Sequence, residues 1–205
     1  RDLLLAKQTG GRIHTAHISS AWSLELVKMA RQKGINITCE VTPHHFTYDE
    51  SALENYDTSY KMSPPLRTKA DVEAMKAGLK SGVIDVIATD HAPHSKDEKN
   101  STFEDAPFGI TGLQTLVPLT LNLVREGVLS YEDMVRVCSK RPAEILGLDD
   151  RGEIAVGKLA DIAIIDPNIE YIFDEKLNFS KSVNSPLFGK SLKGANILSI
   201  KSGKI

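Results

Sequence analysis

The segment from Val83 to Thr89 is a nearly unbroken apolar run with the length of a single strand. Such a run is typical of a parallel strand that helices cover on both faces. Strand patterns also occur at residues 12–17 and 35–42, and helix patterns follow them from Ser20 and from Thr68. The first three quarters of the chain therefore predict β/α units with parallel strands.

Two of the predicted helices carry recognisable start and stop signals. The first begins at Ser19 or Ser20 and ends at Gly34, a residue type that commonly terminates helices. The second begins at Thr68, where Asp71 completes a capping-box pattern. These signals place the helices between the predicted strands.

The pattern changes after Asp150. Residues 151–166 predict two short strands around a Gly-Lys turn, and residues 197–205 predict a final hairpin. Three strand–helix units are too few to close an eight-stranded barrel, which takes about 250 residues. We therefore expect an α/β fold with part of a TIM-type (β/α)8 barrel at residues 1–150 and part of a small β domain at residues 151–205.

Composition limits the classes of partner. The formal net charge is −2 and neither sign dominates a stretch, which argues against nucleic-acid and membrane partners. No apolar run approaches the roughly 20 residues that span a bilayer, and the polar and charged first residues lead us to expect no signal peptide. Cys39 and Cys138 fall within apolar patterns, so we expect reduced core residues in a cytoplasmic protein.

All six histidines occur in three pairs at or just beyond the ends of predicted strands. The carboxyl ends of parallel strands in a barrel open onto one face, where such folds hold their active sites. We therefore expect the pairs to converge there; they are His14 and His17, His44 and His45, and His91 and His94.

His17 and Asp90 are the candidate metal ligands. Imidazole is a common zinc ligand, although a histidine such as His17 often only bonds a loop carbonyl. His14 is an odd number of residues away, so in a strand it points to the opposite side and is expected to be structural. Asp90 ends a buried strand, where a carboxylate is costly unless a metal or partner compensates it. The alternative is an Asp turn with incidental histidines.

Two loops could contact a substrate. Residues 60–67 contain two prolines, with Lys61 and Arg67 available for an anionic substrate, although a stiff surface connector explains the composition equally well. The long polar loop at residues 92–107 is functional or mobile by its length, and Gly109 after it permits close approach of backbone to a ligand.

Taken in order, these motifs resemble dihydroorotases of the larger bacterial type, within the amidohydrolase superfamily. The resemblance covers essentially the whole chain, and its most specific part combines the Pro-Pro-Leu-Arg loop with Asp-His-Ala-Pro-His. The motifs are His-Thr-Ala-His-Ile-Ser (14–19), Glu-Val-Thr-Pro-His-His (40–45), Lys-Met-Ser-Pro-Pro-Leu-Arg (61–67), Ala-Thr-Asp-His-Ala-Pro-His (88–94), Ala-Pro-Phe-Gly (106–109) and Gly-Lys-Leu-Ala-Asp-Ile-Ala-Ile-Ile-Asp (157–166).

The resemblance implies a role for each matching position. His17 would be the zinc ligand at the end of barrel strand six. Asp90, at the end of strand eight, would bind zinc and act as general base and then acid. His94 would contact the substrate carboxylate and ring, and the backbone of Phe108 and Gly109 would line the same pocket.

Three further positions differ from a simple carry-over. Ser63 stands where relatives often have a substrate-binding asparagine, and its shorter side chain lacks the amide. His44 and His45 match the family pattern without being metal ligands, so we expect them to support the ligands from behind.

The resemblance also implies ligands that this sequence does not contain. The His-x-His pair of strand one, the acidic or modified lysine ligand of strand four, the strand-five histidine and a substrate-binding arginine would all lie before Arg1. The first residues, Arg-Asp-Leu-Leu-Leu-Ala, form a pattern typical of the inside of a helix. We therefore expect the C-terminal half of a longer enzyme, with one or two Zn²⁺ ions in the intact protein and no activity in this chain alone.

The implied reaction is hydrolysis of dihydroorotate to N-carbamoyl-L-aspartate, reversed in pyrimidine synthesis. Hydantoinase and allantoinase remain alternatives within the same chemistry. A non-catalytic partner of aspartate transcarbamoylase is a third, and an intact upstream His-x-His would exclude it. A homodimer and an aspartate transcarbamoylase complex are the protein assemblies left open.

Overall fold

The computed structural model describes residues 1–205. Its helices are α1 (Asp2–Thr9), α2 (Ala21–Gln32), α3 (Pro43–Thr47), α4 (Lys69–Lys80), α5 (Lys96–Lys99), α6 (Leu116–Arg125), α7 (Tyr131–Val135) and α8 (Arg141–Leu146), with short 3-10 turns at Glu50–Leu53 and Thr58–Tyr60 and a π-helical turn, Arg136–Lys140, between α7 and α8. The strands are β1 (Ile13–Thr15), β2 (Ile37–Val41), β3 (Val86–Ile87), β4 (Ile162–Ile172) and β5 (Ser191–Ile200).

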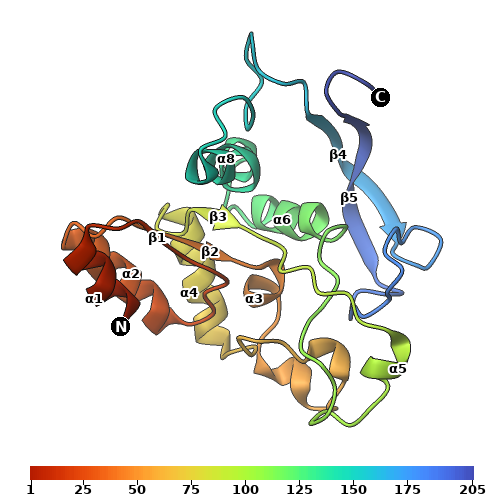
Figure 1. Ribbon diagram of the computed structural model, residues 1–205. Helices are drawn as coiled ribbons and strands as arrows, with labels where there is room; N and C mark the ends of the chain where they lie inside the picture. The colour runs from red at the N-terminus through yellow and green to blue at the C-terminus, as the bar shows by residue number, and fades with distance from the viewer.

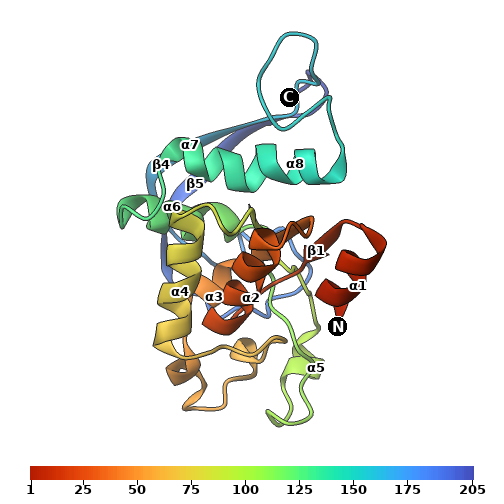
Figure 2. The same ribbon diagram turned by 90° about the vertical axis from the view of Figure 1, so that its left-hand side faces the viewer.

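The first three strands form a parallel sheet in the order β1-β2-β3. Ile13 pairs with Ile37, and Val41 pairs with Ile87, so all three strands run in the same direction from one end of the sheet to the other. Figure 1 shows α2 and α4 beside this sheet, and Figure 2 shows α2, α3 and α4 gathered below α8. The predicted β/α units are therefore confirmed.

The predicted helix starts are also confirmed. The side chain of Ser20 accepts a hydrogen bond from the Ser23 amide at the start of α2. At the start of α4, Thr68 and Asp71 form a reciprocal capping box. Such caps satisfy amides that the first turn of a helix leaves unpaired, which explains why these helices begin where they do.

One hydrophobic core joins the β/α units to the C-terminal segment. It contains apolar side chains from α2, β2, α4 and α6 together with Phe173, Leu187 and Leu192. Cys39 lies in this core with 0% exposure, and both cysteines are free. The chain beyond residue 151 therefore returns to pack on the β/α part.

The strand predictions for the C-terminal segment are wrong in detail. Residues 151–161 form no strand, and the antiparallel hairpin consists of β4 and β5 rather than of residues 197–205. Ile154 is 85% exposed and Val156 is fully exposed, because no neighbouring strand pairs with this stretch. After β5, only a bridge between Lys201 and Lys204 remains of the expected terminal hairpin. The helices of the structure are all too short or too polar to cross a membrane.

Candidate active site

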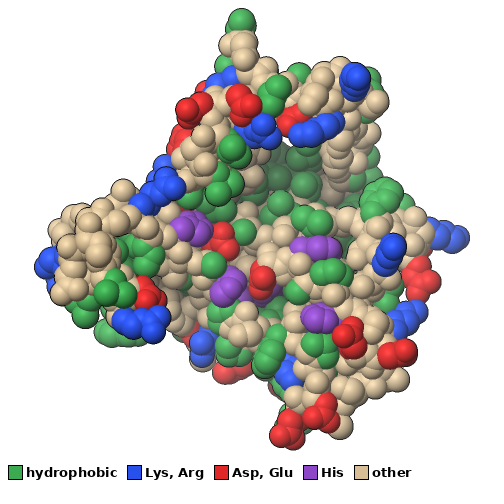
Figure 3. Space-filling view, viewed as in Figure 1, with side chains coloured by type: hydrophobic (Ala, Val, Ile, Leu, Met, Phe, Trp, Pro, Cys, Tyr) green, Lys and Arg blue, Asp and Glu red, His purple; other side chains and the backbone are tan.

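The histidines gather at the carboxyl ends of the three parallel strands. His17 follows β1, His44 and His45 lie on α3 directly after β2, and His91 follows β3. Figure 3 shows histidine and acidic side chains close together on this face, beside a hollow lined with apolar groups. The predicted convergence holds, except that His14 lies within β1.

Both candidate metal ligands have unusual backbones. His17 has φ 37° and Asp90 has φ 48°, which places them among only four non-glycine residues with positive φ. Left-handed backbone costs free energy in residues with a Cβ and is concentrated at functional sites. The two residues that the motifs single out are therefore also the two strand ends at which the backbone is strained.

His17 is held by Glu40, a residue that the sequence did not mark. The Glu40 carboxylate accepts a hydrogen bond from the His17 amide at 3.4 Å, and its other oxygen lies 3.1 Å from Nε2 of His14. The Nδ1 of His14 lies 2.7 Å from the Thr38 hydroxyl. His14 is therefore structural, as expected, and it supports His17 through Glu40. The pairing of β1, which holds His14, with β2, which holds Thr38 and Glu40, was the signal that could have identified Glu40.

His44 and His45 are buried behind these ligands. Burial, together with His45 and His17, holds the pKa of His44 well below its usual range. Burial likewise lowers the pKa of His45 to about 4, against a smaller upward effect of the hydrogen bond to the Pro64 carbonyl; His17 lowers this pKa further and Asp90 raises it. Burial thus disfavours the charged form of both rings, whose centres lie 4.4 Å apart in one neighbourhood directly after β2.

His45 also ties this neighbourhood to the proline loop. Its Nδ1 lies 2.7 Å from the Thr42 hydroxyl, and its Nε2 donates to the Pro64 carbonyl at 2.9 Å. Ser63, next to Pro64, is exposed at the surface of that loop. The structure thus places Ser63 near the site without giving its side chain a partner among the other predicted residues.

The donors of this chain fit part of a zinc site. Nδ1 of His17 is buried without a hydrogen-bond partner, which is the state of a ring nitrogen that awaits a ligand. Imidazole nitrogen and carboxylate oxygen are common zinc donors. However, no group of three His, Cys, Asp or Glu side chains is placed to hold a metal ion. His17 and Asp90 can supply two ligands, which is fewer than a zinc ion requires.

The two ends of the long loop are bonded to each other. Nε2 of His94 donates to the Phe108 carbonyl at 2.9 Å, and the Ala92 amide donates to the Ile110 carbonyl at 2.9 Å. His94, Phe108 and Gly109 therefore lie together, with the Phe108 side chain 56% exposed. Asn184, which the sequence also did not mark, contacts both ends of the long loop from the segment between β4 and β5.

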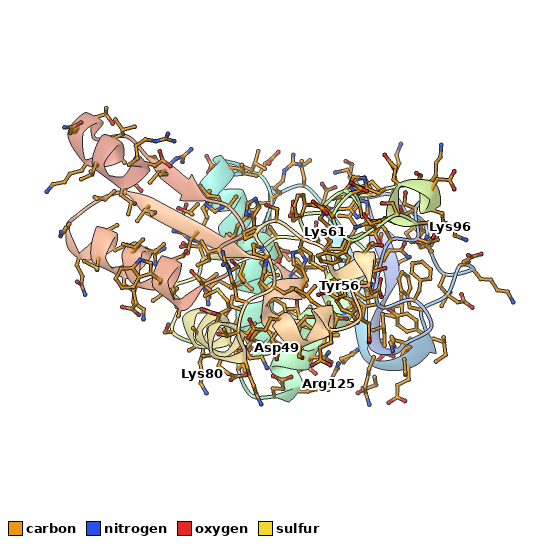
Figure 4. All side chains as sticks on the ribbon, turned by 90° about the horizontal axis from the view of Figure 1, so that it is seen from below. Asp49, Tyr56, Lys61, Lys80, Lys96 and Arg125 are labelled. Atoms are coloured by element: carbon orange, nitrogen blue, oxygen red, sulfur yellow. The ribbon has the colours of Figure 1, made fainter.

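The expectation that Lys61 faces an anionic substrate is wrong. Lys61 is only 8% exposed, its ammonium donates to the Glu104 carbonyl at 2.6 Å, and it lies 4.6 Å from the centre of the Phe108 ring. Lys99 is equally buried and donates to the Thr58 and Pro107 carbonyls. Figure 4 shows Lys61 towards the middle of the molecule and Lys96 at its edge on α5. Buried ammonium groups thus fasten the long loop to the proline loop.

Gly109 is the position where the two ends of the long loop come closest. Its φ is 130°, and a Cβ added there would lie 2.4 Å from Cβ of Ala92. We expect Gly109→Ala to lower the free energy of unfolding by roughly 1–3 kcal/mol from backbone strain alone, with displacement of the loop in addition. Gly127→Ala is the matched control, because Gly127 has φ 70° with nothing within 4 Å of the added Cβ. Urea unfolding checks both; equal losses would contradict the close approach.

The comparisons with known proteins agree with this geometry. The model of the amidohydrolase family matches residues 5–205. The chain is 46% identical over 206 residues to the dihydroorotase of Endomicrobium trichonymphae, covering 100% of this chain and 49% of the relative. It is 47% identical over 205 residues to the dihydroorotase of Geobacter sp. (strain M21), covering 100% of this chain and 48% of the relative. The chain thus spans about half the length of the curated relatives it matches.

Solved structures show the same fold. The L-hydantoinase (dihydropyrimidinase) from Arthrobacter aurescens is 30% identical with a TM-score of 0.90, and the match covers 99% of this chain and 46% of that protein. The D-hydantoinase (dihydropyrimidinase) from Thermus sp. is 27% identical with a TM-score of 0.91, and the match covers 98% of this chain and 46% of that protein. These neighbours support a TIM-barrel-type α/β fold, of which this chain forms a part. With a family model that matches nearly its full length, the chain belongs to the amidohydrolase family.

Proposed function

We propose that this chain is the half of a dihydroorotase that supplies the proton-transfer group and the substrate loops. The observation that carries the proposal is the strained backbone of Asp90 and His17, which follow two parallel strands of one sheet, β3 and β1, at their carboxyl ends. The identity of 46–47% to dihydroorotases along the whole chain supports the substrate class. In this proposal β1, β2 and β3 are barrel strands six to eight, residues 151–205 belong to a small β domain, and the enzyme acts in the cytoplasm in pyrimidine synthesis.

The proposed reaction adds water across the ring amide of dihydroorotate. A bond forms between the water oxygen and the carbonyl carbon, the bond from that carbon to the ring nitrogen breaks, and N-carbamoyl-L-aspartate results. Asp90 takes the proton from the water and delivers it to the leaving nitrogen. His94 and the Phe108–Gly109 backbone bind the substrate, and Ser63 lies at the edge of the same site.

Zinc fits this proposal as the group held by His17 and Asp90. When bound, it supplies Lewis-acid activation of the amide carbonyl and of the attacking water. The remaining ligands must then come from outside these 205 residues. A cavity of about 460 Å³ lies along β1 and is lined by Ile13, His14 and His17 among others, and β1 pairs with β2 only. This open edge is where further strands and ligands would approach.

The test is a chimera in which this chain replaces the matching half of the Endomicrobium trichonymphae dihydroorotase. We expect the zinc-loaded chimera to hydrolyse dihydroorotate and the 205-residue chain alone to be inactive. Turnover of dihydroorotate by the chain alone at the rate of the chimera would contradict the requirement for outside ligands.

A hydantoinase is the second candidate, because the two solved structures compared above are of hydantoinases. Assaying the chimera with dihydroorotate, hydantoin and allantoin separates the two. Faster turnover of hydantoin or allantoin would overturn the assignment to dihydroorotate. A folded, zinc-loaded chimera that hydrolyses none of them would indicate a non-catalytic role, such as a partner of aspartate transcarbamoylase.

A further inference from the structure

Asn184 lies in the segment that returns from β4 to β5 and is 5% exposed. Its side-chain oxygen accepts a hydrogen bond from the His94 amide at 3.1 Å. Its side-chain nitrogen donates to the Ala92 carbonyl at 2.8 Å and to the Gly109 carbonyl at 3.2 Å. A buried amide group whose oxygen and nitrogen are both engaged is rigid, because any rotation leaves a buried polar atom unpaired.

The partners of Asn184 come from both ends of the long loop. Ala92 and His94 begin this loop after β3, whereas Gly109 follows its other end, and the Asn184 carbonyl also accepts from the Thr111 amide at 3.0 Å. One residue, 90 positions away from His94 in the chain, therefore fixes the spacing between the two ends of the long loop from outside it. The close approach of Gly109 to Ala92 is the geometry that this side chain clamps.

We infer that Asn184 is a positioning residue for substrate binding, because it holds His94 and the Gly109 backbone at the spacing that the substrate requires. This role rests on the proposed function of the two ends of the long loop. Asn184 acts through its neighbours rather than on the reacting atoms. The C-terminal segment thereby contributes to substrate affinity without lining the pocket.

An amide is required for this role, because it combines one acceptor with two donors. Asn184→Asp has the same shape and keeps the acceptor for the His94 amide. It loses both donors and places a carboxylate against the carbonyls of Ala92 and Gly109. The two ends of the long loop should then separate, while the hydrogen bond from the His94 amide remains.

Asn178 provides a matched control in the same segment. Its side-chain nitrogen donates to the Ser180 and Ser182 carbonyls, both at 2.9 Å, so its bonds stay within the segment. Asn178→Asp therefore removes the same number of donors without affecting either end of the long loop.

The experiment measures KM and kcat for dihydroorotate in the chimera with each substitution. Two lost hydrogen bonds lead us to expect KM to rise by at least about tenfold in Asn184→Asp, with a smaller change in kcat, and no such split in Asn178→Asp. A merely structural role would lower the amount of folded enzyme and leave KM unchanged. If Asn184→Asp does not fold, the smaller and neutral Asn184→Ala replaces it.

Amide hydrogen exchange in the 205-residue chain provides a readout that does not need activity. We expect Asn184→Asp to speed exchange at the Ala92 amide, which is bonded to the Ile110 carbonyl, and at the Gly109 amide, which is bonded to the Lys61 carbonyl, and Asn178→Asp to leave it unchanged. Equal KM values and equal exchange in the two variants would overturn the inference. An unsubstituted chimera that does not hydrolyse dihydroorotate would instead count against the proposed function, while the exchange comparison would still decide the role of Asn184 as a clamp.

Discussion

Asp90→Asn is expected to lower the turnover of dihydroorotate by the chimera by about 10²–10⁴-fold, the usual contribution of general acid–base catalysis. The amide cannot accept the proton of the attacking water. Asparagine has the shape of aspartate and tolerates the left-handed backbone better than most residues, so φ 48° at this position remains accessible. The fold should therefore survive, and the loss should report on chemistry.

The measurement combines kcat with zinc content and circular dichroism. Zinc content is needed because the amide is also a poorer metal ligand than a carboxylate, and the two effects are separated by assaying at saturating zinc. Asp97→Asn is the control, since Asp97 is an exposed acid on α5, within the long loop that follows Asp90. Turnover in Asp90→Asn above a tenth of the unsubstituted value at saturating zinc would contradict the assignment of Asp90 as the proton-transfer group.

The strand-end positions of the site could be predicted from the sequence because they depend on local patterns. A buried apolar run, a following polar residue and a helix cap together determine where a parallel strand ends. His17 and Asp90 follow from that pattern, as do the caps at Ser20 and Thr68, which the structure confirms. Each of these features involves residues close in the chain.

Features that depend on distant partners could not be predicted in the same way. Lys61 has the charge of a typical surface residue, yet its ammonium group lies in the interior, where it donates to the carbonyl of Glu104, 43 positions later in the chain. No local sequence pattern marks Asn184, because its partners lie at the two ends of the long loop, far upstream in the chain. The β-branched residues near Ile154 have the composition of a strand, but strand formation needs a paired neighbour, and none is present.

Asp85→Ala is expected to produce a large loss of stability. Asp85 lies just before β3, at the opposite end of the strand segment from Asp90, and is 5% exposed. Its carboxylate accepts from Arg31 at 2.5 Å, from Arg141 at 3.1 Å and from the Cys39 amide at 2.9 Å. These donors come from α2, α8 and β2, so one side chain joins three other elements.

Removing this carboxylate leaves the Cys39 amide buried without a partner and Arg31 without its counter-charge, whereas Arg141 keeps its ion pair with Glu144 at 3.0 Å. Breaking a buried ion pair by removing one partner costs about 3–5 kcal/mol. The side chains of Arg31 and Arg141 are 30% and 35% exposed, so water compensates part of the loss. We therefore expect a value near the lower end, about 3 kcal/mol, measured as the change in the free energy of unfolding in urea.

Two further variants show whether the position of the carboxylate matters. Asp85→Asn has the same shape and keeps one acceptor oxygen, but it loses the charge and replaces the other oxygen with an NH2 group, so its loss should lie between those of the native protein and Asp85→Ala. Glu126→Ala breaks an ion pair with Lys76 on the surface and should change stability little, because exposed pairs are screened by solvent. A loss in Asp85→Ala no larger than that in Glu126→Ala would show that the arginines and the Cys39 amide find other partners, and that the three elements are held together by apolar packing alone.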